Sequence, residues 1–68
     1  MMKAKFIRLH DDDRDKICLI NVDHISCVYY DWDSNATRIV FPSEDTFSVR
    51  ESVEEVGSLI ERANFLCG

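Results

Sequence analysis

The sequence predicts an α+β domain in which a five-stranded antiparallel meander, or a small partial barrel, is covered by one C-terminal helix. Two patterns indicate this class. Five short runs rich in β-branched and aromatic residues are separated by clusters of Asp, Asn and Ser, and the stretch after Ser52 repeats its apolar residues with the 3.6-residue period of a helix. Because 68 residues leave room for one hydrophobic core, we expect a single domain over residues 1–68.

The helix is expected to run from a cap at Ser52 to Leu66. The Ser52 hydroxyl can accept a free amide hydrogen of the first turn, and the Glu55 side chain can bond back to the start, which makes a capping box. Gly57 either permits close approach of another segment or is a tolerated surface glycine. One helix face is expected to be buried, because apolar residues recur at helical spacing: Val53, Val56, Leu59, Ile60, Ala63 and Leu66.

Five strands are predicted ahead of the helix, at residues 5–10, 16–20, 25–32, 37–41 and 46–49. Polar residues that favour turns and corners separate them, at 11–15, 21–23, 33–35 and 42–45. In the first strand Ile7 and Leu9 share one face, because side chains alternate along a strand.

The second and third strands carry apolar residues on both faces, and one helix can cover only one face of a sheet. One parity holds Ile17, Leu19, Cys27 and Tyr29, and the other holds Cys18, Ile20, Val28, Tyr30 and Trp32. Soluble monomers rarely expose large apolar patches. We therefore predict a homo-oligomer, most simply a dimer, that associates through the sheet face opposite the helix. A strongly curled sheet that folds its second face inward is the alternative.

The aromatic cluster near the end of the third strand supplies the candidate interface residues Val28, Tyr29, Tyr30 and Trp32. Aromatic residues are enriched at protein interfaces, and such a cluster is more often core or subunit contact than a ligand platform. We predict contact with a second copy of the chain, and an unidentified protein partner is the alternative.

The charge balance disfavours nucleic acid as a partner. The chain has 13 acidic and 8 basic residues, a net charge of −5 and a pI near 4.7, which repels a phosphate backbone. No apolar run approaches the roughly 20 residues of a membrane span, and the N-terminus lacks the apolar region of a secretory signal. The three cysteines fit reduced thiols. We expect a cytoplasmic protein without a membrane span.

Neither a metal site nor a cofactor is predicted. His10, His24, Cys18 and Cys27 are the candidate ligands, but the spacing of His24 and Cys27 places them on opposite faces of a strand. Asp31, Asp33 and Asn35 match the first ligand positions of an EF-hand loop, yet Ala36 replaces its glycine and Pro42 its bidentate glutamate. The acidic loops at 11–15 and 31–35 are both expected to be solvated turns.

A catalytic site is not predicted either. A nucleophilic cysteine needs a nearby base and an electropositive setting, whereas Cys18 and Cys27 occur within apolar strands and are expected to be small core residues. With two glycines in the chain, a glycine-rich phosphate loop or a nucleophile elbow has no candidate. The sequence thus favours a small non-enzymatic protein-interaction or structural module.

Several segments resemble the small flagellar FlbD-type proteins of bacteria and related short bacterial proteins. These are the opening strand Phe6-Ile7-Arg8-Leu9, the corner Ile20-Asn21-Val22-Asp23-His24-Ile25, the strand Ile39-Val40-Phe41 and the ending Val49-Arg50-Glu51-Ser52-Val53-Glu54-Glu55-Val56. The chain departs from that family at 41–45, where a polar-glycine turn is usual, and in the acidic loop 11–15. The resemblance implies a similar fold and a flagellar setting, and it carries over no catalytic residue.

Nucleic-acid-binding regulators supply the alternative function. The order of strands and helix is similar to the start of LytTR-type DNA-binding domains, but the chain ends at Asn64-Phe65-Leu66-Cys67-Gly68, where that family adds its basic DNA-contacting strand. Carbon storage regulator proteins, which bind RNA, also have short strands followed by a helix. This chain lacks the basic surface that RNA binding needs.

A gel-shift assay at low salt with mixed DNA and RNA separates the two functions. We expect no shift, because the net charge is −5 and a binder must neutralise several phosphates. A shift that weakens steeply with added salt would contradict this prediction.

Overall fold

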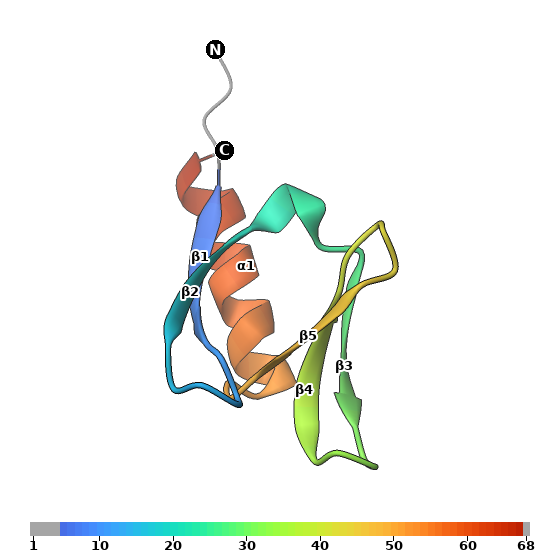
Figure 1. Cartoon of the computed structure of the whole chain (residues 1–68). Helices are drawn as coiled ribbons and strands as arrows, with labels where there is room; N and C mark the ends of the chain where they lie inside the picture. The colour runs from blue at the N-terminus through green and yellow to red at the C-terminus, as the bar shows by residue number, and fades with distance from the viewer. Residues whose placement is uncertain (1–4, 68) are drawn as a thin grey trace.

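The computed structural model describes residues 5–67 of the chain. Within this range the elements are, in order, β1 (Phe6–His10), β2 (Ile17–Asn21), a 3₁₀ helix η1 (Val22–His24), β3 (Cys27–Asp31), β4 (Ala36–Val40), β5 (Thr46–Val49) and α1 (Val53–Cys67) (Figure 1). Each predicted strand and the predicted helix is present, with ends within two residues of the expected positions.

The strands form two antiparallel sheets, so the prediction of a single five-stranded meander or partial barrel is wrong. β1 pairs with β2, and β3, β4 and β5 form a second sheet in that order. The reason is the corner after β2. Asn21 Oδ1 accepts the amide of Asp23 at 3.0 Å, and the resulting 3₁₀ turn carries the chain away from β2. The Ser26 amide then bonds to Val40 O at 2.8 Å, which directs β3 onto β4.

The three hairpin turns use polar residues as predicted. Each contains one residue in the left-handed region, Asp15 (φ 54°), Asn35 (φ 54°) or Glu44 (φ 72°). In two of them an aspartate side chain accepts an amide two residues later: Asp11 Oδ1 from Asp13 at 2.8 Å, and Asp31 Oδ1 from Asp33 at 3.0 Å. The acidic loops are therefore built as local turns.

A single hydrophobic core lies where α1 packs between the two sheets, against β1 on one side and β3 on the other (Figure 1). The predicted inner face of β1 is confirmed, since Ile7 and Leu9 are both buried. On α1, Val56 is fully buried; Leu59, Ile60 and Ala63 pack around the core, and the side chain of Leu66 lies outside the described part. The buried apolar residues that complete the cluster are Ile20, Val22, Ile39 and Val49.

The two sheets meet at one corner, where the end of β1 lies beside the end of β5 (Figure 1). The Arg50 amide donates to His10 O at 2.9 Å, and the Asp12 amide donates to Ser48 O at 3.1 Å. These two bonds flank an isolated bridge between Asp11 and Val49. Backbone pairing therefore connects the sheets without making them one sheet.

The predicted capping box at the start of α1 is confirmed. Ser52 Oγ accepts the amide of Glu55 at 3.1 Å, and Glu55 Oε1 accepts the amide of Ser52 at 3.0 Å. Gly57 has nothing within 4 Å of the position that a Cβ would occupy. The close-approach interpretation of Gly57 is thus wrong.

No helix within residues 5–67 combines the length and the apolar character needed to cross a lipid bilayer.

Replacing Gly57 by alanine is expected to raise the free energy of unfolding by about 0.5–1 kcal/mol. Alanine has the higher helix propensity, and its methyl group enters open space. Urea denaturation followed by circular dichroism measures the change. Ser52→Ala, at the cap of the same helix, should lower the free energy of unfolding by about 0.5–2 kcal/mol, because it removes the capping hydroxyl. A Gly57→Ala protein less stable than the wild type would show that the glycine is required.

Candidate functional site

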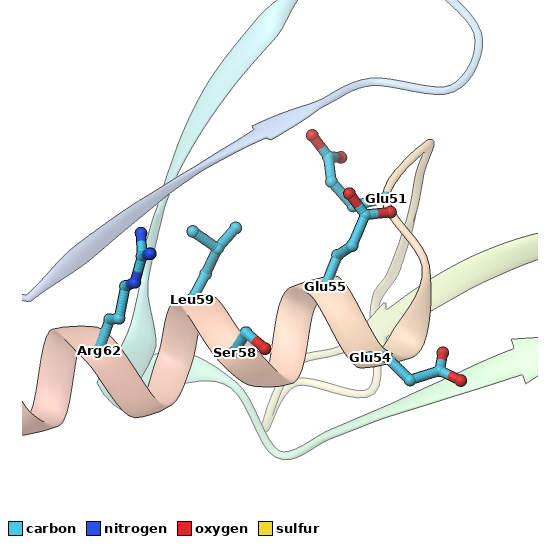
Figure 2. Close-up of a pocket in the computed structure, with 6 residues that line it drawn as sticks. All are labelled: Glu51, Glu54, Glu55, Ser58, Leu59 and Arg62. Carbon is cyan, nitrogen blue, oxygen red and sulfur yellow. The ribbon is translucent and has the colours of Figure 1, made fainter.

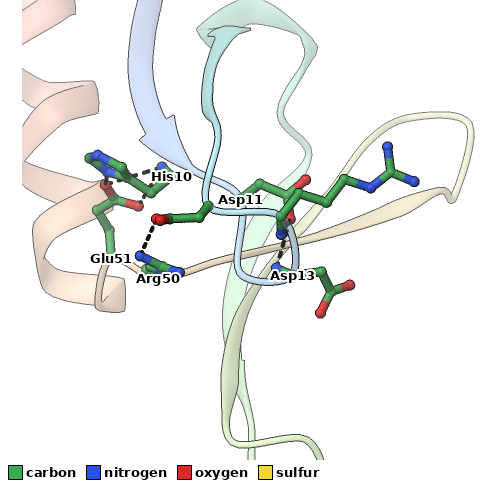
Figure 3. Close-up of polar contacts among 7 residues, drawn as sticks. His10, Asp11, Asp13, Arg50 and Glu51 are labelled. Atoms are coloured by element: carbon green, nitrogen blue, oxygen red, sulfur yellow. Dashed lines mark hydrogen bonds and ion pairs between the residues drawn. The ribbon is translucent and has the colours of Figure 1, made fainter.

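The carboxylate of Glu51 connects β1 to the start of α1. Its two oxygens lie 2.9 and 3.2 Å from the His10 amide nitrogen, and its Oε2 lies 2.6 Å from His10 Nδ1 (Figure 3). Because a carboxylate only accepts hydrogen bonds, Nδ1 is the donor of this contact. The Glu51 side chain is 14% exposed and that of His10 is 43% exposed. The sequence patterns indicated His10 only as a candidate metal ligand and contained no signal for this pairing.

Two opposing effects act on the pKa of Glu51. Burial raises it, whereas hydrogen bonds from the His10 ring and the His10 backbone amide lower it, and together the bonds hold the pKa below the ordinary value of 4.5. The ionised form is therefore stabilised in the folded chain. It locks the helix start against β1 at the corner where the sheets meet.

A second carboxylate organises the outer face of the three-stranded sheet. Asp31 Oδ2 accepts from Arg38 Nε at 2.8 Å, and this bond, followed by the bond from the Asp33 amide, lowers the pKa of Asp31. Arg38 also lies 3.4 Å from both Ser34 Oγ and Thr46 Oγ1. The Asp31–Arg38 pair therefore holds the β3–β4 turn in place, and its cation is already engaged.

The four predicted interface residues do not lie on one surface. Val28 is half-buried and packs against the core, together with buried Ile39 opposite it on β4. Tyr29, paired with Arg38, lies on the opposite face of β3. Tyr30 and Trp32 contact each other edge to face, with ring centroids 4.7 Å apart. Because Tyr30 shares the parity of Val28, this pair is on the helix side of the sheet, which differs from the expected face opposite the helix.

The apolar residues opposite the helix lie instead on β1 and β2. Phe6, Ile17 and Leu19 are 52%, 58% and 65% exposed, and the β1–β2 register places all three on the face away from Ile7 and Leu9. We call these three residues the outer patch. The alternation of residues along β1 and β2 contains the signal for this patch. The prediction placed the interface on the third strand instead, because aromatic residues cluster there.

A groove lies between the aromatic pair and the first turn of α1, and we call it the aromatic groove. Its volume is about 420 Å³, and its lining consists of Tyr30, Trp32, Thr37, Ser52, Val53 and Glu54. The Tyr30 hydroxyl donates to Asn35 Oδ1 at 3.3 Å, which fixes one wall. Trp32, which is 81% exposed, lines the groove beside Tyr30.

A second groove of about 410 Å³ runs along the exposed side of α1, and its lining is Glu51, Glu54, Glu55, Ser58, Leu59 and Arg62. Figure 2 shows Glu55, Leu59 and Arg62 rising from one side of the helix, while Glu54 points away on the other side. The first turn of α1 therefore presents negative charge toward both grooves.

Cys18 and Cys27 differ in their surroundings. Both are free thiols; Cys18 on β2 is half-buried, whereas Cys27 on β3 is exposed. The expectation that both are core residues is thus wrong for Cys27, because it shares the parity of Tyr29 and lies on the face of β3 away from the core. Within the described residues, groups of three or more His, Cys, Asp or Glu side chains suited to a metal ion do not occur.

Comparisons with family models, with curated proteins and with solved structures find no match for this chain.

Replacing Glu51 by glutamine is expected to lower the free energy of unfolding by about 1–3 kcal/mol at neutral pH, since hydrogen bonds to a charged group are the strong ones. Because the folded-state pKa is depressed, the stabilisation is present above 4.5 and is lost as the pH falls through the folded pKa. The difference between the variant and the wild type should therefore shrink below about pH 4.5. Urea denaturation at several pH values measures it.

Glu61→Gln is the matched control, because Glu61 is an exposed carboxylate in the middle of α1. Its stability should follow the wild type within about 0.5 kcal/mol at each pH. Parallel stability curves for wild type and Glu51→Gln would contradict the role assigned to Glu51.

Proposed function

We propose that this chain is a small non-enzymatic protein-interaction module that self-associates, most simply as a dimer, through the outer patch. The observation that carries the proposal is the exposure of Phe6, Ile17 and Leu19 on one face of β1 and β2. Fully burying a large apolar side chain contributes about 1.5–3 kcal/mol. A second copy of the patch offers matching apolar surface.

The position of β2 supports a symmetric contact. Among the described strands, β2 pairs with β1 alone, so its other edge is open. An open edge is a template for pairing with another chain, and Ile17 and Leu19 project from this edge strand. Two β2 strands related by a two-fold axis would run antiparallel and bring their Leu19 side chains together. Closed two-fold contacts are the commonest kind in soluble oligomers.

The arrangement of titratable groups supports a role without catalysis. Cys18 and Cys27 belong to different sheets. The ring of His10 contacts Glu51 and not a cysteine. The contacts of the described residues thus give neither thiol the adjacent base that a nucleophile requires.

Charge favours a protein partner over the alternative of a nucleic-acid-binding regulator. Glu51, Glu54 and Glu55 gather at the start of α1, and two of the arginines, Arg38 and Arg50, are paired with Asp31 and Asp15. A phosphate backbone would meet repulsion from the carboxylates at the helix start and from the net charge of −5. The resemblance to FlbD-type proteins adds a flagellar setting as part of the proposal.

Light scattering coupled to size exclusion tests self-association. We expect the wild type at micromolar concentration to have a mass that is a multiple of 7.9 kDa. Leu19→Glu places a charge in the centre of the outer patch and should reduce the mass to 7.9 kDa. Circular dichroism should show an unchanged fold, because Leu19 is exposed.

Trp32→Glu is the control with the same new charge on the helix side of the sheet, and it should leave the mass unchanged. A wild-type mass of 7.9 kDa that is unchanged on dilution would contradict the proposed dimer. Dissociation by Trp32→Glu and not by Leu19→Glu would instead place the contact at the aromatic pair.

A further inference from the structure

We infer that the aromatic groove binds a basic segment of a protein partner, with an arginine side chain placed between Trp32 and Glu54. This site is separate from the outer patch. It goes beyond self-association, because it requires a partner of different chemistry.

The walls of the groove suit a flat cation. The rings of Tyr30 and Trp32 meet at an interplanar angle of 76°, so one ring presents its edge to the face of the other and both border the groove. At 81% exposure, Trp32 is the most exposed of the large apolar side chains described. An aromatic face attracts a cation through its quadrupole, and arginine is the cation most often found there.

The charge of the groove selects for a cation as well. Its lining contains one carboxylate, Glu54, and no lysine or arginine among the described residues. The ion pairs formed by the described residues do not include Glu54, so its charge is not engaged by a neighbouring side chain. With a net charge of −5, the whole chain adds to the attraction.

The helix start does not offer a competing anion site. A helix N-terminus attracts anions through its unbonded amides, but here Ser52 Oγ already accepts the amide of Glu55. Glu54 and Glu55 add negative charge to the same turn. A carboxylate or phosphate would therefore be repelled where a guanidinium is attracted.

Arginine fits this geometry better than lysine does. A guanidinium is planar, so it can stack on an indole face and still direct two N–H donors toward a carboxylate. A lysine ammonium is a strongly hydrated point charge, which gains less from the flat wall. A groove of about 420 Å³ has room for an arginine and part of the neighbouring peptide.

Tryptophan fluorescence of the full chain provides the assay, because Trp32 is the one tryptophan in the sequence. The probes are hexaarginine, hexalysine and hexaglutamate peptides at about 0.15 M salt. We expect a saturable change in fluorescence with hexaarginine and no change with hexaglutamate. Hexalysine should bind more weakly than hexaarginine, by roughly threefold or more. For the Trp32→Leu variant, titration calorimetry measures hexaarginine binding instead of fluorescence. The substitution should weaken this binding roughly 3- to 30-fold.

Two variants of equal net charge separate a site from general attraction. Glu54→Gln should weaken hexaarginine binding roughly two- to fivefold, whereas Glu61→Gln, elsewhere on α1, should leave it unchanged. Equal weakening by both variants, or equal affinity for the two basic peptides, would overturn the proposal. A lower mass by light scattering for Trp32→Leu than for the wild type would also overturn the proposal, because the groove would then be the contact with a second copy of the chain.

Discussion

The structure depends on one corner, where Glu51 and the backbone of residues 48–50 hold the end of β1. The Glu51 carboxylate bonds both the amide and the ring of His10, and backbone bonds from Arg50 and to Ser48 join β1 to β5. This corner fixes the angle between the two sheets and the direction in which α1 begins. The hydrophobic core lies between the two sheets and α1. The packing of the core therefore relies on the same contacts. A polar constraint thus positions an apolar core.

The two exposed surfaces follow from how α1 is placed. The helix covers the inner face of β1 and β2 and leaves Phe6, Ile17 and Leu19 outside. On the other sheet, the helix start stands opposite Tyr30 and Trp32 and turns them into one wall of a groove. The first surface carries three exposed apolar side chains, and the second combines two aromatic rings with the carboxylate of Glu54. The proposed self-association and the proposed basic partner would therefore use different surfaces of the chain.

Parts of the fold and of the site could be predicted because they depend on neighbours in the sequence. Alternation along β1 assigned Ile7 and Leu9 to the core, and parity separated Tyr29 from Tyr30. Parity does not say which face meets the helix, and Tyr30 and Trp32 were assigned to the wrong one for that reason. The Glu51–His10 contact joins residues 41 positions apart, and neither residue carries a local pattern that indicates the other.

By itself, the sequence determined the strands, the polar turns with Asp15, Asn35 and Glu44, and the capping box of Ser52 and Glu55. All of these rest on backbone preferences and hydrogen bonds within a few residues. The tertiary structure alone decided that the strands divide into two sheets, that Cys27 is exposed at a sheet edge, and that Trp32 faces Glu54 across a groove. The physical reason is that strand pairing and groove formation depend on contacts between distant segments, which local periodicity does not encode.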